Sequence, residues 1–325
     1  MTVGAVLPVG TSTSVRVPGS SANLGPGFDC LGIALGVSDD VDVTVVDEGL
    51  TVEVTGEGAG GVPLDEAHLV VRALRRGLDV AGVSAPGLHV RCVNRIPHSR
   101  GLGSSAAAAV GGLAAASGLV SAAGVAPRFG HDELIQLSSE FEGHPDNAAA
   151  SVLGGAVVSW TEVADAGSAA SGADSAAEAS AGGCRYFARS IPLHDDLAVS
   201  AFVPAVESST SVTRGLLPDS VARADAVFNV SRSALAVIAL SRDPECLFAA
   251  TQDRLHQHYR APVMRPSAEL VAGLRQMGLA AVISGAGPTV LVLRWKSLPP
   301  AAGELAARLG FSVVEPPIAD GVSIV

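Results

Sequence analysis

Alternating hydrophobic and polar positions in the first hundred residues predict strands that are buried on one face. Between residues 41 and 46, three valines alternate with Asp42 and Thr44, which is the period of a half-buried β-strand. The same pattern predicts strands at 15–17, 51–55 and 88–93. In the last of these, His89 and Arg91 occupy polar positions, and such alternation favours an antiparallel strand over one covered on both faces.

Hydrophobic spacing of three and four residues predicts helices in the rest of the chain. The segment 67–80 places its valines and leucines mainly on one face, as an amphipathic helix does. The segment 105–119 is rich in alanine, and Gly111 and Gly112 within it each cost a helix about 1 kcal/mol, which indicates close packing. Helices are also predicted at 132–141, 222–240 and 268–277, and strands at 197–203 and in two stretches between 281 and 293.

The order of these elements predicts an α+β fold in two domains. A chain of 325 residues suits two cores at about 150 residues each. We expect an N-terminal domain over 1–160 and a C-terminal domain over 187–325, whose last residues are free to return to the first domain. Between them, 161–186 is a low-complexity insertion of Ala, Ser, Gly and acidic residues, which cannot bury a core.

Charge and lysine content exclude several classes of function. The 21 basic and 32 acidic residues give a net charge of −11 without a basic cluster, so no nucleic-acid partner is expected. Lys296 is the only lysine, and it lies in a polar stretch near the C-terminus. Schiff-base chemistry and the lysine-dependent P-loop are therefore not expected.

The cysteines and the uncharged segments predict a cytoplasmic protein without a membrane partner. The four cysteines lie far apart, which is typical of a reducing compartment. Residues 1–13 are interrupted by glycine and proline and lack a basic start, unlike a signal peptide. The segment 101–127 has no charge and is long enough to span a membrane, but its Ala, Gly and Ser content favours a buried helix.

A glycine-rich loop precedes the alanine-rich helix and is the first candidate binding site. Small residues at Gly101, Gly103 and Ser104 would let backbone N–H groups and a helix N-terminus approach a phosphate. Ser104 and Ser105 offer hydroxyl oxygens to Mg²⁺. The spacing also fits the dinucleotide fingerprint, although a half-polar strand and the lack of a following acidic residue disfavour a dehydrogenase. A turn that only caps the helix is the remaining alternative.

Two further segments offer polar groups for a substrate. The loop 19–29 presents Asn23 and Asp29, which can bind an ammonium or a hydroxyl or can satisfy their own backbone in Asx turns. Polar residues also crowd the end of the helix predicted at 132–141, namely Glu140, Glu142, His144, Asp146 and Asn147. A carboxylate there can hold Mg²⁺, and the alternative is a solvated turn with a capping aspartate.

Arginine and small residues mark three segments in the second half of the chain. Arg214 and Arg260 each lie among small or polar residues. An arginine fork binds a carboxylate through two hydrogen bonds, but a surface position is the default for an arginine, so neither residue alone indicates a site. No cysteine or carboxylate completes a zinc site with His256 and His258. The small-residue loop 284–289 allows close approach of phosphate or another loop, or forms a simple hairpin turn.

Taken together, these motifs resemble the GHMP small-molecule kinases and, within that superfamily, the homoserine kinase family. Three motifs carry the resemblance in order, at 18–29, 97–106 and 284–289, and the likeness covers about residues 15–295. The resemblance implies an N-terminal domain like domain 2 of ribosomal protein S5, a ferredoxin-like C-terminal domain, and an active site between them. It also implies transfer of the γ-phosphoryl group of ATP to the side-chain hydroxyl of L-homoserine, giving O-phospho-L-homoserine for threonine biosynthesis, with Mg²⁺ as cofactor.

The resemblance assigns roles to residues of this chain. ATP would be bound by Pro97, Arg100, Gly101, Leu102, Gly103, Ser104, Ser105, Ala106 and His68. Mg²⁺ would be held by Ser105 and Glu142. The substrate would be bound by Asn23, Asp29, His144, Asp146, Thr210, Arg214, Arg260 and Gly287. Catalysis would depend on Asn23, Glu142, Asp146 and Asn147.

This chain departs from the family pattern at two positions. His68 stands where the family often has asparagine near the adenine, so a different nucleotide preference is open. Asn147 stands where other members of the superfamily have an aspartate base, which predicts phosphoryl transfer without a side-chain general base.

Two other functions are weighed against this one. A mevalonate-pathway kinase or decarboxylase would act on substrates without an ammonium, leaving Asn23, Asp29 and Asp146 without a purpose. A catalytically silent nucleotide-binding regulator is disfavoured by the presence of Glu142 and the loop serines. A homodimer is compatible with the sequence.

Overall fold

A seven-stranded sheet organises the N-terminal domain, and β3 is its longest strand. The computed structural model describes residues 5–163, 183–205 and 215–325. The strands of this sheet are β2 (Ser12–Ala22), β3 (Leu31–Val46), β4 (Gly49–Gly56), β6 (Gly87–Asn94), β7 (Ala156–Val163), β8 (Cys184–Ile191) and β13 (Ser323–Ile324). β3 pairs antiparallel with β2, with β7 at its start and with β6 towards its end. β6 is antiparallel to β3 as expected, and it is parallel to β4.

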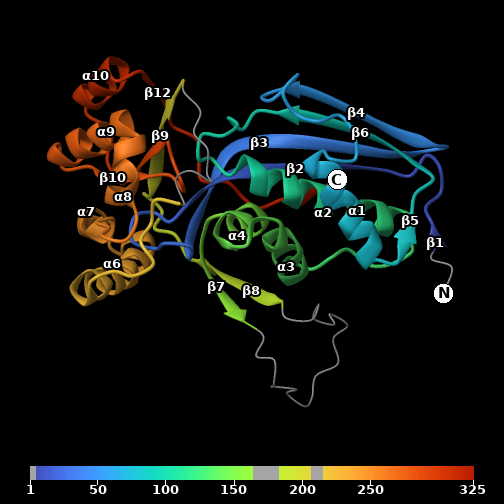
Figure 1. The fold of residues 1–325 in the computed structure, drawn as a ribbon, viewed down its shortest axis with the longest axis horizontal. Helices are drawn as coiled ribbons and strands as arrows, with labels where there is room; N and C mark the ends of the chain where they lie inside the picture. Colours follow the sequence, from blue (N-terminus) through green and yellow to red (C-terminus); the bar gives the residue numbers. More distant parts are fainter. Residues whose placement is uncertain (1–4, 164–182, 206–214) are drawn as a thin grey trace, which may run out of the picture.

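Four helices cover one face of this sheet (Figure 1). They are α1 (Leu69–Val80), α2 (Ser104–Ala122), α3 (His131–Glu142) and α4 (Asp146–Leu153). Glycines let α2 approach its neighbours closely: a Cβ on Gly112 would lie 2.3 Å from the carbonyl oxygen of Val70 in α1, and one on Gly118 would lie 2.1 Å from Thr13 Oγ1 in β2. The close packing predicted from the glycines of this helix is therefore confirmed. The short β1 (Ala5–Val6) pairs with β5 (Val83–Ser84) beside α1.

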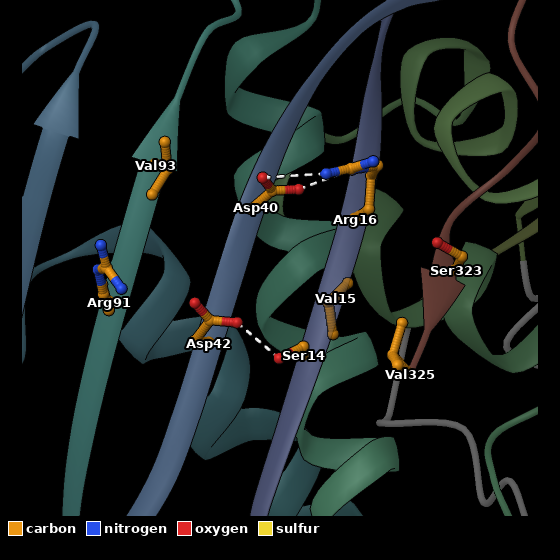
Figure 2. Close-up of a pocket in the computed structure, with 9 residues that line it drawn as sticks. All are labelled: Ser14, Val15, Arg16, Asp40, Asp42, Arg91, Val93, Ser323 and Val325. Atoms are coloured by element: carbon orange, nitrogen blue, oxygen red, sulfur yellow. Dashed lines mark hydrogen bonds and ion pairs between the residues drawn. The ribbon is translucent and has the colours of Figure 1, made fainter.

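The other face of the sheet is polar and forms a shallow hollow of about 360 Å³ across β13, β2, β3 and β6 (Figure 2). Arg16 binds Asp40 through two hydrogen bonds, and Ser14 donates to Asp42. These pairs are the polar positions of the alternating pattern, so the sheet buries one face only. None of the glycine-rich loops lines this hollow.

The C-terminal domain has the ferredoxin-like topology that the resemblance implies. Its strands are β9 (Ala198–Pro204), β10 (Ala280–Ile283), β11 (Val290–Arg294) and β12 (Phe311–Val314), in the spatial order β10-β11-β9-β12. Its helices are α6 (Arg223–Ser241), α7 (Leu247–Ala250), α8 (Gln257–Arg260), α9 (Arg265–Gln276) and α10 (Pro300–Arg308), with 3₁₀ turns at Pro244–Cys246 and Ala261–Val263. The predicted α+β class is thus confirmed.

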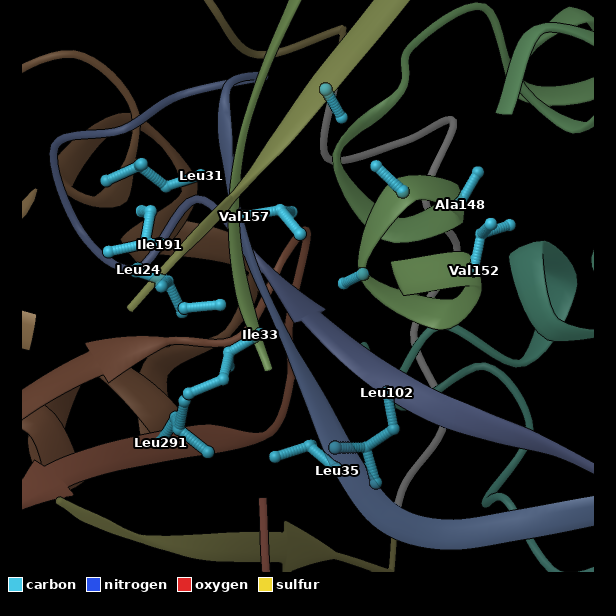
Figure 3. Packing of buried hydrophobic residues seen from close by; sticks show 14 of the residues in the cluster. Leu24, Leu31, Ile33, Leu35, Leu102, Ala148, Val152, Val157, Ile191 and Leu291 are labelled. Atoms are coloured by element: carbon cyan, nitrogen blue, oxygen red, sulfur yellow. The ribbon is translucent and has the colours of Figure 1, made fainter. Parts of the chain in front are cut away.

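Hydrophobic packing continues from one domain into the other (Figure 3). One cluster of buried side chains includes Ile33 of β3 and Val157 of β7 together with Leu291 of β11. Leu24, which is fully buried in the loop between β2 and β3, belongs to the same cluster. The two domains are therefore joined by a shared core as well as by the chain.

The strand pairing refines the division of the chain. β8 spans residue 187, where the C-terminal domain is predicted to start, and it pairs with β7 along its whole length. We therefore propose a boundary after Ile191. The C-terminal tail returns to the first domain, where Ile318 bridges to Leu35 and β13 pairs with β2.

The predicted helices and strands are found with shifted ends, and several elements were missed. β2 continues to Ala22, so the irregular loop after it is shorter than the sequence suggests. The missed elements include α4, β7, β8, β12 and α10. The ends of the insertion predicted at 161–186 are wrong, because residues 161–163 belong to β7 and residues 184–186 to β8. The rest of it, residues 164–182, and also Thr210 and Arg214 lie outside the described residues. Among the described helices, α2 and α6 have the length and composition of a membrane span, which is weak evidence, and α2 is mostly buried in the protein.

The glycines of α2 give a test of this packing. In Gly112→Ala the new Cβ meets the backbone of α1 at 2.3 Å, whereas in Gly111→Ala it meets only side-chain methyl groups of Val41 and Val17 at 3.2 and 3.4 Å. Both changes gain the same helix propensity of about 1 kcal/mol. We expect Gly112→Ala to lower the free energy of unfolding by about 2 kcal/mol and Gly111→Ala to leave it almost unchanged, as measured by urea denaturation. Equal effects would show that α1 and α2 are not held in close contact.

Candidate active site

The glycine-rich loop leaves the N-terminus of α2 open to an anion. Gly101 and Gly103 have φ values of +77° and +70°, which residues other than glycine adopt only at a cost in free energy. A Cβ on Gly103 would lie 2.2 Å from Ser20 Oγ, so only glycine fits there. No side chain caps α2 and its first turn has no acidic residue. Its first backbone N–H groups and the helix dipole can therefore bind a phosphate.

The third glycine-rich loop, residues 284–289 of the C-terminal domain, packs against the loop of residues 97–106. We call the latter the phosphate-binding loop, after the role that the sequence predicts for it. The hydroxyl of Ser284 lies at hydrogen-bond distance from the carbonyl oxygen of Gly101 and 2.8 Å from Ser21 Oγ. A Cβ on Gly101 would lie 2.6 Å from the carbonyl oxygen of Gly287. The predicted substrate residue Gly287 is thus beside the phosphate-binding loop, at the contact between the domains.

Arg100 links the phosphate-binding loop to the C-terminal domain. Its guanidinium donates to the carbonyl oxygens of Pro204, at the end of β9, and of Ala205, and to that of His98. Its own carbonyl oxygen accepts from the N–H of Thr289 at 3.2 Å. These contacts tie the loop to the end of β9 and to the loop of residues 284–289.

Acidic groups gather at the start of α4. One oxygen of Asp146 lies 2.6 Å from His144 Nδ1 and accepts from the backbone N–H of Asn147 at 2.7 Å. Ligand atoms of Asp29, His144 and Asp146 all lie within 4.8 Å of one another. Burial, together with the carboxylates of Asp146 and Asp29, raises the pKa of the Cys30 thiol to about 11. This cluster therefore has a negative potential that suits a cation such as an ammonium.

Asn23 uses its side chain to shape the loop between β2 and β3. Its Oδ1 accepts from the backbone N–H of Asp29 at 2.9 Å, and its Nδ2 donates to the carbonyl oxygen of Gly285 at 2.9 Å. The first bond is the local backbone contact that the sequence left open as an alternative. The second joins the loop to the C-terminal domain, and together the two bonds hold Asp29 in the acidic cluster.

The side chain of Asn147 contacts Ser20 near the end of β2. Its Oδ1 accepts from the hydroxyl of Ser20 at 3.0 Å, and Ser20 in turn lies against Gly103. Ser20 is fully buried, and its backbone N–H donates to the carbonyl oxygen of Leu102 at 3.0 Å. Asn147 therefore connects α4 to the phosphate-binding loop.

Arg260 is almost completely buried at the other side of the site. Its Nη1 donates to the carbonyl oxygen of Gly285 at 3.1 Å and lies 3.1 Å from His256 Nδ1. Its guanidinium is 5.5 Å from the ring centre of Phe28. A buried guanidinium with a fixed fork is suited to a carboxylate.

Two oxygen-bearing side chains fit the magnesium ion that the family implies. Ser105 is exposed in the first turn of α2, and Glu142 is the last residue of α3. The two helices pack against each other. A hydroxyl and a carboxylate are the ligand types that Mg²⁺ prefers, so the donor set fits the ion.

His68 lies at the start of α1 and is 6% exposed. Burial lowers its pKa below 6.5, and the nearby His98 adds to this effect, so the ring is neutral at physiological pH. Within the described part of the chain, its Nδ1 has no hydrogen-bond partner. A buried polar atom left in this way is typical of a position that a ligand completes.

Asn229 and Asp253 were missed by the sequence analysis, and His256 was considered as a zinc ligand and as part of the resemblance, without a role of its own. The side chains of all three are buried. Asn229 and His256 bond the loop between β2 and β3, and Asp253 contacts both of them. The signal available in the sequence was the position of Asp253 just before a short helix, since an aspartate there commonly binds free backbone N–H groups. Nothing local indicates Asn229, because its contact lies 203 residues away.

Comparisons with known proteins agree with this geometry. The family model of the GHMP kinases N terminal domain matches residues 68–155, and that of the GHMP kinases C terminal domain matches residues 235–308. A homoserine kinase of Mycolicibacterium smegmatis is 58% identical over 97% of this chain and 96% of its own length. A homoserine kinase of Rhodococcus erythropolis is 54% identical over 98% and 97%.

A solved structure shares the fold over nearly the whole chain. The crystal structure of homoserine kinase from Cytophaga hutchinsonii aligns with a TM-score of 0.77 at 23% identity and covers 97% of this chain and 98% of its own. The two family models and these relatives show that the chain belongs to the GHMP kinase superfamily and, within it, to the homoserine kinase family.

Proposed function

We propose that this chain transfers the γ-phosphoryl group of ATP to the side-chain hydroxyl of L-homoserine. One observation carries the proposal: the uncapped N-terminus of α2, the acidic cluster and the buried Arg260 each lie beside a contact between the two domains, namely Gly101 with Ser284, Asn23 with Gly285, and Arg260 with Phe28. Relatives at 54% and 58% identity over almost the full chain are named homoserine kinase. The four cysteines are free thiols, in keeping with a cytoplasmic enzyme.

The triphosphate would lie on the phosphate-binding loop. Backbone N–H groups from Gly101 to Ala106 would bind its oxygens. They would replace the lysine that other phosphate sites use, since Lys296, the only lysine, lies near the C-terminus. Ser105 and Glu142 would hold Mg²⁺, which neutralises phosphate charge when it is bound. His68, with its buried Nδ1 lacking a partner among the described residues, would contact the nucleobase.

The amino-acid part of the substrate would lie between the acidic cluster and Arg260. Asp29 and Asp146 would receive the ammonium, with His144 fixing the Asp146 carboxylate, and Arg260 would bind the carboxylate group. Opposite charges at the two ends fix the orientation of the substrate, so its hydroxyl can be aimed at the phosphate.

The reaction would proceed without a side-chain general base. Asn147 has an amide in place of a carboxylate, and that amide is already bound to Ser20. The hydroxyl proton would pass to a phosphate oxygen or to water, and positioning with charge neutralisation would supply most of the rate.

A panel of acceptors tests the substrate. We expect kcat/KM for homoserine to exceed that for serine, threonine and mevalonate by on the order of a hundredfold, because buried polar groups left unpaired reject a poor fit. The measurement is ADP release in a coupled assay, with ATP alone as the background. Turnover of mevalonate in preference to homoserine would move the assignment to another branch of the superfamily.

The magnesium ligand is tested by Glu142→Gln, with Glu140→Gln as the matched control. Glu140 lies two residues earlier on the same helix and pairs with Arg76. Loss of one anionic ligand should raise the half-saturating Mg²⁺ concentration about tenfold, equivalent to about 1.4 kcal/mol, whereas the control should match the parent. An unchanged Mg²⁺ dependence in Glu142→Gln would remove this residue from the metal site.

The absence of a general base is tested by Asn147→Asp. An aspartate retains an oxygen that can accept from Ser20, so the local geometry is kept while a carboxylate is introduced. We expect kcat to stay at or below the parent value, with no new acidic limb in its pH profile. A rise in kcat together with such a limb would show that a base at this position assists the reaction.

A further inference from the structure

The turn that carries Asn23 and Asp29 is strained and must be held in shape. Asn23, Leu24 and Asp29 have φ values of +71°, +46° and +53°. Left-handed conformations of residues other than glycine cost of order 1 kcal/mol or more each. Three of them within seven residues persist only where surrounding contacts impose them.

Side chains of the C-terminal domain impose this shape. The carbonyl oxygen of Gly25 lies 2.7 Å from His256 Nε2, and that of Pro26 accepts from Asn229 Nδ2 at 3.2 Å and from Ser233 Oγ at 2.8 Å. His256 has no exposed surface and Asn229 is 2% exposed. The turn is therefore anchored by buried hydrogen bonds that cross the domain contact.

The partners of His256 determine its protonation. A carbonyl oxygen such as that of Gly25 only accepts, so Nε2 carries the proton; a guanidinium only donates, so Nδ1 of His256 accepts from Arg260 at 3.1 Å. Burial lowers the pKa of His256; the carboxylate of Asp253 opposes this, the charge of Arg260 adds to it, and the net direction is downward, which keeps the ring neutral. The imidazole of His256 thus bonds both Gly25 of the turn and Arg260. The ring of Phe28 lies against this imidazole and against the Arg260 guanidinium.

Asp253 fixes the backbone from which His256 projects. Its Oδ2 accepts from the N–H groups of His256 and Gln257 at 3.0 and 2.8 Å, and its Oδ1 accepts from Asn229 Nδ2 at 3.0 Å. Burial alone would raise the pKa of this carboxyl, but the hydrogen bonds that it accepts from Gln257, Leu255 and Asn229 help to hold it below its usual value. The group is a fixed acceptor that orients both Asn229 and His256.

We propose that His256, oriented by Asp253, is a positioning residue that sets the separation between the Asn23–Asp29 turn and Arg260. The inference rests on the proposed function, in which these two groups bind opposite ends of homoserine. His256 itself contacts neither end of the substrate. Its loss should therefore weaken homoserine binding while leaving the phosphate-binding loop and ATP unaffected.

Two substitutions of His256 separate its two bonds. His256→Leu removes both, and we expect the KM for homoserine to rise at least about tenfold while the KM for ATP stays within about twofold. His256→Gln keeps a donor near the position of Nε2 and should restore part of the loss, because the bond to Gly25 can form again. Steady-state kinetics with each substrate varied in turn gives both constants.

Ser200→Ala serves as the control for a loss of buried hydrogen bonds. Ser200 is fully buried in β9, accepts from Arg294 and donates to Glu315, away from the turn. We expect it to lower the unfolding midpoint without changing either KM. If His256→Leu does not fold, His256→Gln and Asn229→Ala, which removes the donor to Pro26, carry the test with a smaller rise in the KM for homoserine.

The outcomes that overturn the inference are distinct from a failure of the proposed function. A folded His256→Leu whose KM for homoserine lies within twofold of the parent overturns the positioning role, as does an equal rise in both KM values. A parent chain that does not phosphorylate homoserine overturns the proposed function, and the inference with it. Selective loss of homoserine binding with partial rescue by glutamine supports both.

Discussion

The close packing of α2 against the sheet and α1 is the constraint on which the site depends. Small residues let the helix run so near its neighbours that a single added carbon on Gly112 or Gly118 would meet an atom at 2.3 Å or less. A helix held this tightly has a fixed N-terminus. That terminus lies where the loop of residues 284–289 arrives from the other domain, so the anion site and the domain contact are parts of one arrangement.

The scarcity of lysine determines how phosphate can be bound. With Lys296 near the C-terminus and Arg100 bound to carbonyl oxygens of the C-terminal domain, the positive potential at the start of α2 comes mainly from its backbone N–H groups. Backbone donors do not move when a ligand arrives, and they require glycine where the chain approaches closely. The φ values of Gly101 and Gly103 meet that requirement.

Local patterns predicted much of this structure, and contacts over long sequence distances account for the rest. Strands β2, β3, β4 and β6 and helix α1 followed from periodicity. α4 was missed because it is short, nearly all small residues and buried on most sides, which leaves no polar face to detect. The Asn229–Pro26 bond joins residues 203 positions apart, and no pattern within either segment indicates it.

The substrate side of the site is therefore a property of the domain contact rather than of either domain alone. The carbonyl oxygen of Gly285 accepts from both Asn23 and Arg260, so one backbone atom of the C-terminal domain ties the turn of the first domain to the buried arginine. Hydrophobic packing across the contact supplies attraction but little direction, whereas hydrogen bonds to a single carbonyl fix distance and angle. Recognition of a small amino acid by its two charged ends requires such hydrogen bonds. A displacement of about 1 Å between the groups that bind the two ends already weakens binding and lowers the rate.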